Sequence, residues 1–314
     1  MVDGGALFFG RKELVASGQP IAITIGNFDG VHLGHRQVLN TLIASSNGCP
    51  TVALTFDPHP SVLLSPELAK PALSTVQQRV ELLLAAGIDL VVVQNFSKEF
   101  ASLSADEFVA DYLLKQFNLS AAVIGFDFCY GAQRRGNWEH LESSAKKNGF
   151  SAIRSEPYMM HGLPVSSSRI RAAILQRDFQ AASEMLGRDF TLSGVVVQGD
   201  QRGRQLGFPT ANLGLEDQNI LIPPYGVYAV EIFLPEEKSP RFGVMNCGVR
   251  PTIAQGLKLQ IEAHILDFDA DIYGNRVQFA VKKFIRTEMK FSGLDHLKSQ
   301  IQDDVAQARI FFGV

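Results

Sequence analysis

Residues 26–35 read Gly26-Asn27-Phe28-Asp29-Gly30-Val31-His32-Leu33-Gly34-His35, and this stretch decides the fold of the first half of the chain. It follows an apolar run, 21–25, that predicts a buried strand, and it leads into an apolar-periodic segment, 33–43, that predicts a helix. Glycines at such a turn let the backbone approach a ligand, and free N–H groups at a helix start attract anions. His32 and His35 are expected on one face of the first helical turn, beside the positive end of the helix dipole. The pattern indicates a phosphate site.

Two other interpretations of this stretch stay open at the level of sequence. A glycine-rich turn is a common connection between a strand and a helix, whatever its function. The two histidines could also bind zinc with His59 as a third ligand, although no cysteine or carboxylate falls at a familiar zinc spacing.

Strands and helices alternate through the rest of the first half. Strands are predicted at 21–25, 51–56, 90–94, 121–125 and 151–154, with helical patterns between them. Capping boxes are predicted where Ser74 precedes Gln77 and where Ser104 precedes Glu107. Short apolar strands that alternate with helices predict a Rossmann-like α/β domain with a parallel sheet covered on both faces. Ligands of such sheets bind beyond the carboxyl ends of the strands, so the turns that follow these strands are expected to converge.

The pattern changes at Gly187-Arg188-Asp189, where we predict a boundary between domains 1–187 and 188–314. Beyond it the apolar residues alternate with period 2: in the predicted strand 257–265, Ile261 and Ala263 fall on one face and Glu262 on the other. Further strands are predicted at 192–197, 227–233, 242–246 and around 277–281. Several antiparallel strands in a short span predict a small closed β-barrel, and helical spacing over 294–312 predicts a terminal helix that packs on it.

Composition narrows the class of protein. The 314 residues carry a net charge of -3 and have a pI of about 6.2, which disfavours a general nucleic-acid binder, since such proteins are usually basic. Cys49, Cys129 and Cys247 are far apart and odd in number, as expected of reduced thiols in the cytoplasm. The sequence shows no secretory signal and no apolar run of membrane-spanning length. We expect a soluble cytoplasmic protein with small-molecule partners and no nucleic-acid or membrane partner.

Three further stretches contain residues that could bind a ligand or a metal ion. Ser166-Ser167-Ser168-Arg169-Ile170-Arg171 suits a triphosphate, because it places hydroxyls at a helix start and arginines one turn later; it also suits an ordinary N-cap with solvated arginines. Residues 125–136 follow a strand and combine aromatic and basic groups, which suit a ring system with a phosphate, or they form a turn with core aromatics. Residues 199–213 are glycine-rich and end in Pro209-Thr210-Ala211-Asn212, whose hydroxyl and amide oxygens suit magnesium; a long connection is the competing interpretation.

These motifs resemble those of the bacterial bifunctional riboflavin kinase/FMN adenylyltransferases, also called FAD synthetases. The resemblance includes Phe56-Asp57-Pro58-His59-Pro60, residues 246–252 and residues 262–268, and it spans both halves in the right order. It implies an amino-terminal nucleotidyltransferase domain and a carboxyl-terminal riboflavin kinase barrel. The implied reactions are phosphorylation of riboflavin by ATP to FMN, then adenylylation of FMN by a second ATP to FAD with release of pyrophosphate. The implied metal is Mg²⁺.

By this resemblance, His32 and His35 are the catalytic groups of the adenylyltransferase site. The expected ATP-binding residues there are Gly26, Asn27, Phe28, Asp29, Gly30, Gly34, Ser166, Ser167, Ser168 and Arg171, and the expected flavin-binding residues are Asp57, His59, Asp127, Phe128 and Arg134. The chain departs from the family pattern where Ser168 replaces a threonine, where Tyr130 replaces a phenylalanine, and at Cys129, a position that is often basic.

The resemblance also implies a kinase site. Glu262 is the expected base, which accepts the proton of the ribityl 5′-hydroxyl, while Thr210 and Asn212 hold Mg-ATP. The residues expected around the phosphates are Gly199, Gly203, Arg204 and Gly207. Two rival functions stay open: a related nucleotidyltransferase that acts on another acceptor, and a flavin-sensing protein without turnover.

Overall fold

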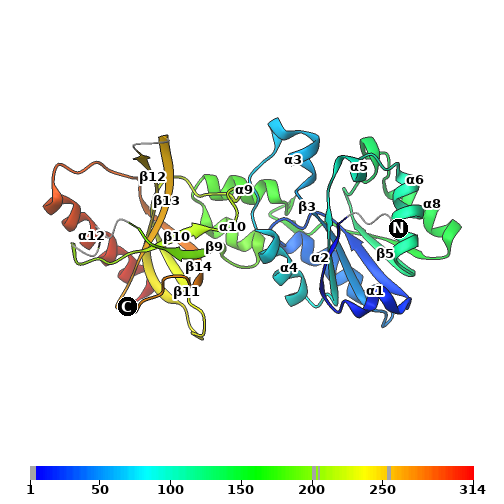
Figure 1. Ribbon diagram of the computed structural model, residues 1–314, viewed down its shortest axis with the longest axis horizontal. Helices are drawn as coiled ribbons and strands as arrows, with labels where there is room; N and C mark the ends of the chain where they lie inside the picture. Colours follow the sequence, from blue (N-terminus) through cyan, green and yellow to red (C-terminus); the bar gives the residue numbers. More distant parts are fainter. Residues whose placement is uncertain (1–4, 200–202, 204–205, 253–255) are drawn as a thin grey trace. The chain divides into compact units, whose positions relative to one another are not determined.

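The computed structural model describes residues 5–199, 203, 206–252 and 256–314. The chain divides into two compact units, Met1–Ser167 and Ser168–Val314, each with its own sheet (Figure 1). Helix α9 (Ser167–Leu175) starts at this division, and α10 (Phe179–Leu186) belongs to the second unit. The functional boundary that the sequence places after residue 187 stays a prediction, because a functional domain need not end where the packing divides.

The first unit contains a six-stranded sheet with the order β1-β4-β3-β2-β5-β6. Its strands are β1 (Leu7–Gly10), β2 (Ile21–Ile25), β3 (Thr51–Asp57), β4 (Leu90–Asn95), β5 (Leu119–Gly125) and β6 (Ser151–Ser155). The five predicted strands, β2 to β6, are present and parallel. Strand β1 was not predicted from the sequence; it pairs antiparallel with β4 and makes the sheet mixed.

Helices cover both faces of this sheet (Figure 1). They are α1 (Glu13–Ser17), α2 (Leu33–Ser45), α3 (Pro60–Leu64), η1 (Pro66–Leu68), α4 (Val76–Ala85), α5 (Lys98–Ala101), α6 (Ala105–Glu107), η2 (Phe108–Leu113), α7 (Leu114–Gln116), η3 (Ala132–Arg134) and α8 (Trp138–Asn148). Neighbouring strand residues enter opposite cores: Ala22 packs with Leu39 of α2, whereas Ile23 packs in the cluster that holds Leu141 of α8. This double burial explains why the strands are continuous apolar runs. A short hairpin, β7 (Met159–Met160) with β8 (Leu163–Pro164), precedes α9.

One predicted capping box is confirmed and one is wrong by a residue. Ser104 and Glu107 cap α6 as expected. The box that opens α4 is formed by Thr75 and Gln78, not by Ser74 and Gln77. Ser74 is used elsewhere, because it makes hydrogen bonds to the turn after β2.

The second unit is a closed antiparallel barrel, as the sequence predicts. Its strand order is β10-β13-β12-β11-β14-β9. Its strands are β9 (Phe190–Val197), β10 (Ala211–Leu215), β11 (Gly226–Phe233), β12 (Arg241–Thr252), β13 (Gly256–Ile265) and β14 (Arg276–Arg286). Strand β10 was not predicted. The expected alternation holds in β13, where Ile261, Ala263 and Ile265 are buried. The predicted terminal helix, α12 (Leu294–Phe312), packs Ala308 against the barrel.

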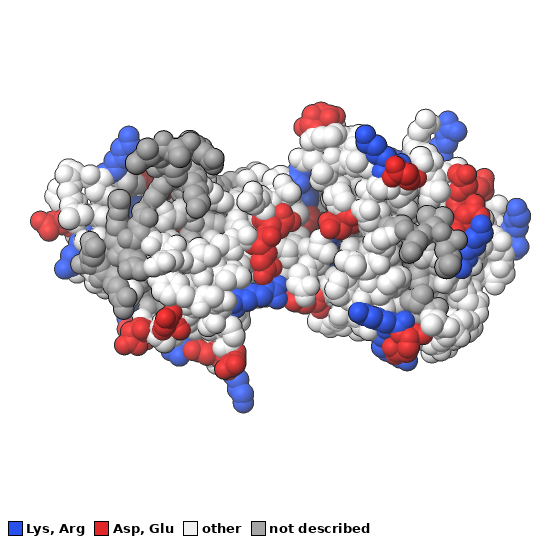
Figure 2. Space-filling view, in the orientation of Figure 1, with Lys and Arg blue, Asp and Glu red and all other residues white. Residues whose placement is uncertain are grey.

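Charged side chains of both signs are interspersed on the face drawn in Figure 2, and most of that surface is uncharged. Among the described residues, we find no helix with the length and apolar character needed to cross a membrane.

Candidate active sites

The turn that joins β2 to α2 has an unusual backbone. Phe28, Gly30 and Val31 have positive φ angles of 49°, 77° and 37°. Residues other than glycine rarely adopt positive φ angles, and each one that does so lowers the stability of the fold by about 1–3 kcal/mol. The ring of Phe28 packs closely on Gly26, where a Cβ would lie 3.1 Å from the ring and would push it away by a few tenths of an ångström. Such a conformation persists only where other contacts hold it.

Asp29 supplies several of these contacts. The buried carboxylate accepts hydrogen bonds at Oδ1 from the main-chain nitrogens of Leu73, at 2.8 Å, and Ser74, at 3.2 Å. Ser74 Oγ in turn accepts from the Gly30 nitrogen at 3.0 Å, and Ser167 Oγ donates to the main-chain oxygen of Asp29 at 3.1 Å. Asp29 therefore shapes the turn and links it to the start of α9.

Arg79 lies beneath the same turn, and the sequence analysis missed it. Its side chain is buried, and Nη1 donates to the main-chain oxygens of Asn27, at 2.8 Å, and Phe56, at 3.1 Å, and to Thr55 Oγ1, at 3.1 Å. The guanidinium thus joins the ends of β2 and β3. The sequence could have indicated this burial, because Arg79 lies three residues after Val76 and therefore falls on the apolar face of α4.

The two predicted catalytic histidines lie against each other. His32 is the N-cap of α2, one residue before the helix, and not part of the first helical turn as predicted. Its Nδ1 accepts from the main-chain nitrogen of His35 at 3.3 Å, and the two rings stack with centroids 3.6 Å apart. Gly34 permits the packing, because a Cβ there would lie 3.1 Å from the His32 ring. Both imidazoles are therefore held at the amino end of a helix, where anions bind favourably.

The predicted site regions of the first unit share one edge of the sheet. Strands β3, β2 and β5 are adjacent and parallel, so Asp57, Gly26 and Gly125 mark neighbouring carboxyl ends. His59 is the N-cap of α3, and its Nδ1 lies 2.8 Å from Ser61 Oγ. This arrangement is the crevice position that open α/β sheets use for ligands.

The segment that follows β5 carries Asp127, Phe128 and Arg134, which are expected to bind flavin. Asp127 and Arg134 are exposed, and Phe128 is half-buried. Tyr130 forms the base of this segment: its main chain pairs with Gly136, and its ring is buried and lies parallel to the Phe128 ring.

A chain of polar groups holds Tyr130 in place. Its hydroxyl lies 2.7 Å from His140 Nδ1 on α8, and His140 Nε2 lies 3.1 Å from Asp106 Oδ1 on α6. The Asp106 carboxylate can only accept, so His140 Nε2 carries the hydrogen of this contact. In the neutral imidazole Nδ1 then accepts from the Tyr130 hydroxyl, which keeps its proton because burial raises the pKa of the phenol. The sequence departure at Tyr130 thus has a partner that the family phenylalanine would lack.

The serine-arginine motif opens α9. Ser166 precedes this helix, Ser167 is its first residue and bonds to Asp29, and Ser168 is exposed. Arg171, one turn later, is partly buried. Ser168 and Arg171 belong to the second unit, so their predicted part in the first site stays a prediction.

In the barrel, the predicted kinase residues meet side by side. Asn212 on β10 pairs with Glu262 on β13, and Thr210 Oγ1 donates to Glu262 Oε2 at 3.2 Å. Gln260 Nε2 donates to both Asn212 Oδ1, at 3.0 Å, and Glu262 Oε2, at 3.2 Å. The period-2 alternation predicted for 257–265 puts Gln260 on the same face as Glu262, but it indicates no role for Gln260.

The expected phosphate-loop glycines are placed in part. A Cβ on Gly199 would lie 2.3 Å from Asn212 Nδ2, and a Cβ on Gly203 would lie 2.4 Å from the Phe208 oxygen, so both permit close approach. Gly207 has a φ of 86°. Arg204 lies outside the described residues.

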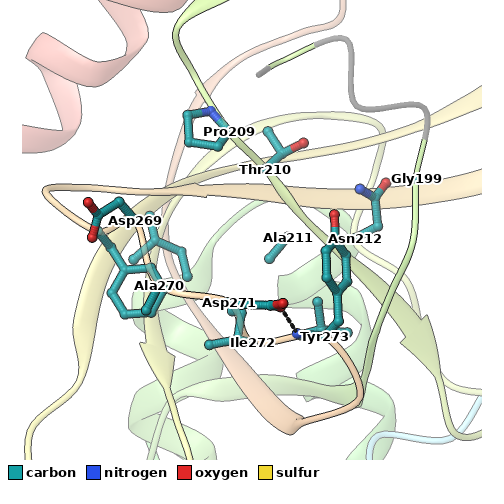
Figure 3. Close-up of a pocket in the computed structure, with 13 residues that line it drawn as sticks. Gly199, Pro209, Thr210, Ala211, Asn212, Asp269, Ala270, Asp271, Ile272 and Tyr273 are labelled. Carbon is teal, nitrogen blue, oxygen red and sulfur yellow. Dashed lines mark hydrogen bonds between the residues drawn. The ribbon is translucent and has the colours of Figure 1, made fainter. Parts of the chain in front are cut away.

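Two cavities open beside Thr210. The first, about 270 Å³, is lined by Thr210, Asn212 and a segment that includes Tyr273 (Figure 3). The second, about 640 Å³, is lined by Thr210, Glu262 and apolar residues of α12. Thr210 is common to both walls.

Within the part of the chain that the structure describes, no group of three or more histidine, cysteine, aspartate and glutamate side chains could hold a metal ion. The zinc interpretation with His32, His35 and His59 therefore has no support.

Comparison with known proteins shows the family. A model described as FAD synthetase matches residues 15–169, and one described as riboflavin kinase matches residues 186–312. The bifunctional riboflavin kinase/FMN adenylyltransferase of Escherichia coli K12 is 39% identical over 294 residues, which cover 93% of each chain. This chain belongs to that family. The predicted enzyme class and both predicted activities are thereby confirmed.

A second member of the bifunctional family and a solved structure match more than nine-tenths of the chain. The Haemophilus influenzae enzyme is 37% identical over 94% of this chain and 95% of its own. A crystal structure described as a macrolide-efflux protein from Streptococcus pneumoniae matches with a TM-score of 0.82 and 31% identity, over 96% of this chain and 97% of that one. We take from this structure the agreement in fold, a mostly parallel α/β half followed by an antiparallel barrel.

Proposed function

We propose that residues 1–187 adenylylate FMN and that residues 188–314 phosphorylate riboflavin. The observation that carries the kinase assignment is the shared wall at Thr210. A nucleotide in the smaller cavity and a flavin in the larger one would meet where Thr210 contacts Glu262.

In the kinase step, the ribityl 5′-oxygen attacks the γ-phosphorus of ATP. The new O–P bond forms as the bond between the γ-phosphorus and the β–γ bridging oxygen breaks, and ADP leaves. Glu262 accepts the proton of the hydroxyl. Its position beside Thr210, on the wall of the larger cavity, is consistent with this role.

The metal proposed for this site is Mg²⁺. The proposed ligands are the hydroxyl of Thr210 and the amide oxygen of Asn212, which are hard oxygen donors on neighbouring residues. Two protein ligands suit Mg²⁺, because this ion keeps several waters and takes phosphate oxygens. When bound, the ion would neutralise charge on the transferring phosphoryl group.

In the adenylylation step, a phosphate oxygen of FMN attacks the α-phosphorus of ATP and pyrophosphate leaves. The N–H groups of the turn after β2, together with His32 and His35, stabilise the developing charge. Arg171 and the serines of 166–168 hold the leaving phosphates. The residues proposed to hold FMN are Asp57, His59, Asp127, Phe128 and Arg134.

We place both reactions in the cytoplasm, with small molecules as partners. The three cysteines, Cys49, Cys129 and Cys247, are all free, as expected in a reducing compartment.

Two variants test the division of labour. Glu262→Gln should abolish FMN formation from riboflavin and leave FAD formation from supplied FMN intact. His32→Asn keeps an N-cap acceptor but removes the imidazole, and it should do the reverse. Glu231→Gln, on β11 outside both cavities, is the matched control. Products are separated by chromatography after incubation with ATP and Mg²⁺; loss of both activities in one variant would contradict separate sites.

A further inference from the structure

Three polar side chains of β13 hold one short segment of the chain. Gln260, Glu262 and His264 alternate along the strand and therefore point to the same face. His264 Nδ1 lies 2.8 Å from the main-chain oxygen of Pro209, Glu262 accepts from Thr210, and Gln260 donates to Asn212. Each side chain thus fixes a different residue of the segment 209–212.

Gln260 differs from the other two because it touches both functional partners. Its amide nitrogen has two hydrogens; one points to Asn212 Oδ1 and the other to Glu262 Oε2, at 3.0 Å and 3.2 Å. The opposite orientation of the amide would place three oxygens in contact without a hydrogen between them, so the network assigns the nitrogen to this position.

We propose that Gln260 is a positioning residue of the kinase reaction. It sets the separation between Asn212, which holds the metal-nucleotide, and Glu262, which accepts the proton. Asn212 and Glu262 are cross-strand partners, and an oxygen of each accepts a hydrogen bond from the same nitrogen of Gln260. Two acceptors side by side repel, and the amide of Gln260 bridges them.

The bridge matters most when a divalent cation lies beside Asn212. An untethered carboxylate would be drawn toward the cation and would become a ligand instead of a base. Gln260 and Thr210 both donate to Glu262 Oε2, and these bonds hold the carboxylate away from such a movement. The inference rests on the roles proposed above for Glu262 and Asn212.

The test compares Gln260→Leu, which removes both donors at similar size, with Gln278→Leu, a control on β14 that lines neither cavity. In Gln260→Leu we expect kcat for FMN formation to fall about tenfold or more, and the KM for riboflavin to change less than about twofold. The half-saturating Mg²⁺ concentration should shift. FAD formation from supplied FMN, measured on the same full-length chain, should stay at the wild-type level.

A binding measurement separates positioning from loss of structure. We measure the affinity of each variant for ADP by calorimetry, with and without Mg²⁺. Without Mg²⁺, Gln260→Leu should bind ADP with the wild-type affinity. The increase in ADP affinity on adding Mg²⁺ should differ between Gln260→Leu and the wild type. Unchanged kcat together with an unchanged Mg²⁺ response would overturn the inference, and so would an equal loss of metal-free binding. Full kinase activity in Glu262→Gln would instead remove the proposed base, and with it the reason for the bridge.

Discussion

Arg79 and Asn27 are joined by a hydrogen bond of 2.8 Å from the guanidinium to the main-chain oxygen, beneath the turn that precedes the two histidines. The same nitrogen also reaches Thr55 and Phe56 at the end of β3. A buried cation therefore supports a backbone turn that is proposed to receive a triphosphate, and it ties together two of the strands that frame the site.

Replacing Arg79 should damage the adenylyltransferase reaction. Arg79→Met leaves buried carbonyl oxygens without a donor, which costs about 1–3 kcal/mol each and lowers the free energy of unfolding. We expect kcat/KM for FAD formation to fall about tenfold or more, with partial recovery in Arg79→Lys, since a lysine keeps the charge but not the fork. The Arg79 variants should keep the wild-type kinase activity. Arg36→Met, at an exposed position, is the control and should keep the wild-type rate of FAD formation. Wild-type FAD formation in Arg79→Met would show that the turn does not depend on this residue.

Tyr130→Phe should weaken FMN binding specifically. The substitution removes only the hydroxyl that contacts His140, which costs about 1 kcal/mol and loosens the segment that carries Phe128 and Arg134. We expect the KM for FMN to rise about threefold to tenfold, while the KM for riboflavin stays constant. Steady-state kinetics check this, with Tyr158→Phe as the control. A double-mutant cycle with His140→Ala should show a coupling energy; additive effects would count against the contact.

Gly199→Ala should impair the kinase site through Asn212. A Cβ would lie 2.3 Å from Asn212 Nδ2, so the amide must rotate and lose its bond to Gln260. We expect kcat for FMN formation to fall about tenfold. Gly293 has open space around its Cβ position and an extended backbone, so Gly293→Ala is the control. Equal activities in the two variants would refute the close approach.

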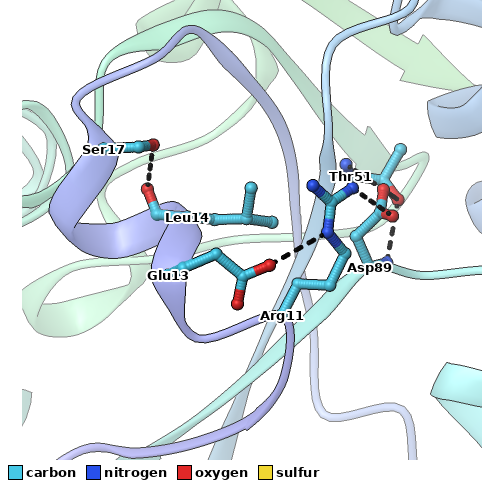
Figure 4. A network of polar contacts seen from close by, with 6 residues as sticks. All are labelled: Arg11, Glu13, Leu14, Ser17, Thr51 and Asp89. Atoms are coloured by element: carbon cyan, nitrogen blue, oxygen red, sulfur yellow. Dashed lines mark hydrogen bonds and ion pairs between the residues drawn. The ribbon is translucent and has the colours of Figure 1, made fainter.

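The network around Asp89 makes the stability of the first unit depend on pH (Figure 4). Asp89 Oδ2 accepts from the nitrogen and hydroxyl of Thr51 at 2.9 Å and 3.0 Å, and Oδ1 accepts from Arg11. Burial alone would raise the pKa of Asp89, but these hydrogen bonds outweigh it and lower the pKa from its usual value of 3.8.

A lowered pKa in the folded state stabilises the protein above the unfolded-state pKa, and the stabilisation is lost as the pH falls through the folded pKa. Asp89→Asn should therefore lower the free energy of unfolding at pH 7 by about 1–2 kcal/mol. The difference from wild type should shrink below about pH 4. Urea unfolding at both pH values measures it, with the exposed control Asp269→Asn. A difference independent of pH would contradict the proposed charge effect.

The sequence predicted the strands of the first unit well because a strand buried on both faces must be apolar throughout. Strand β10 was not predicted, because residues 211–215 contain a glycine and an asparagine and begin two residues after Pro209. The capping box was ambiguous for a similar local reason: Ser74 and Thr75 each precede a glutamine by three residues. Contacts with Asp29 and Gly30, more than forty residues away, commit Ser74 to the turn and leave Thr75 to cap the helix.

Local pattern was enough to infer the two-part architecture, the turn between β2 and α2, the polar face of β13 and, through the motifs, the family. Those features depend on residue type and spacing along one segment. Only the tertiary structure shows three other contacts: Arg79 supports the turn, His140 holds Tyr130, and Gln260 bridges Asn212 and Glu262. Each joins groups that are distant in the sequence or lie on different elements, and a hydrogen bond depends on distances in space that spacing along the chain does not encode.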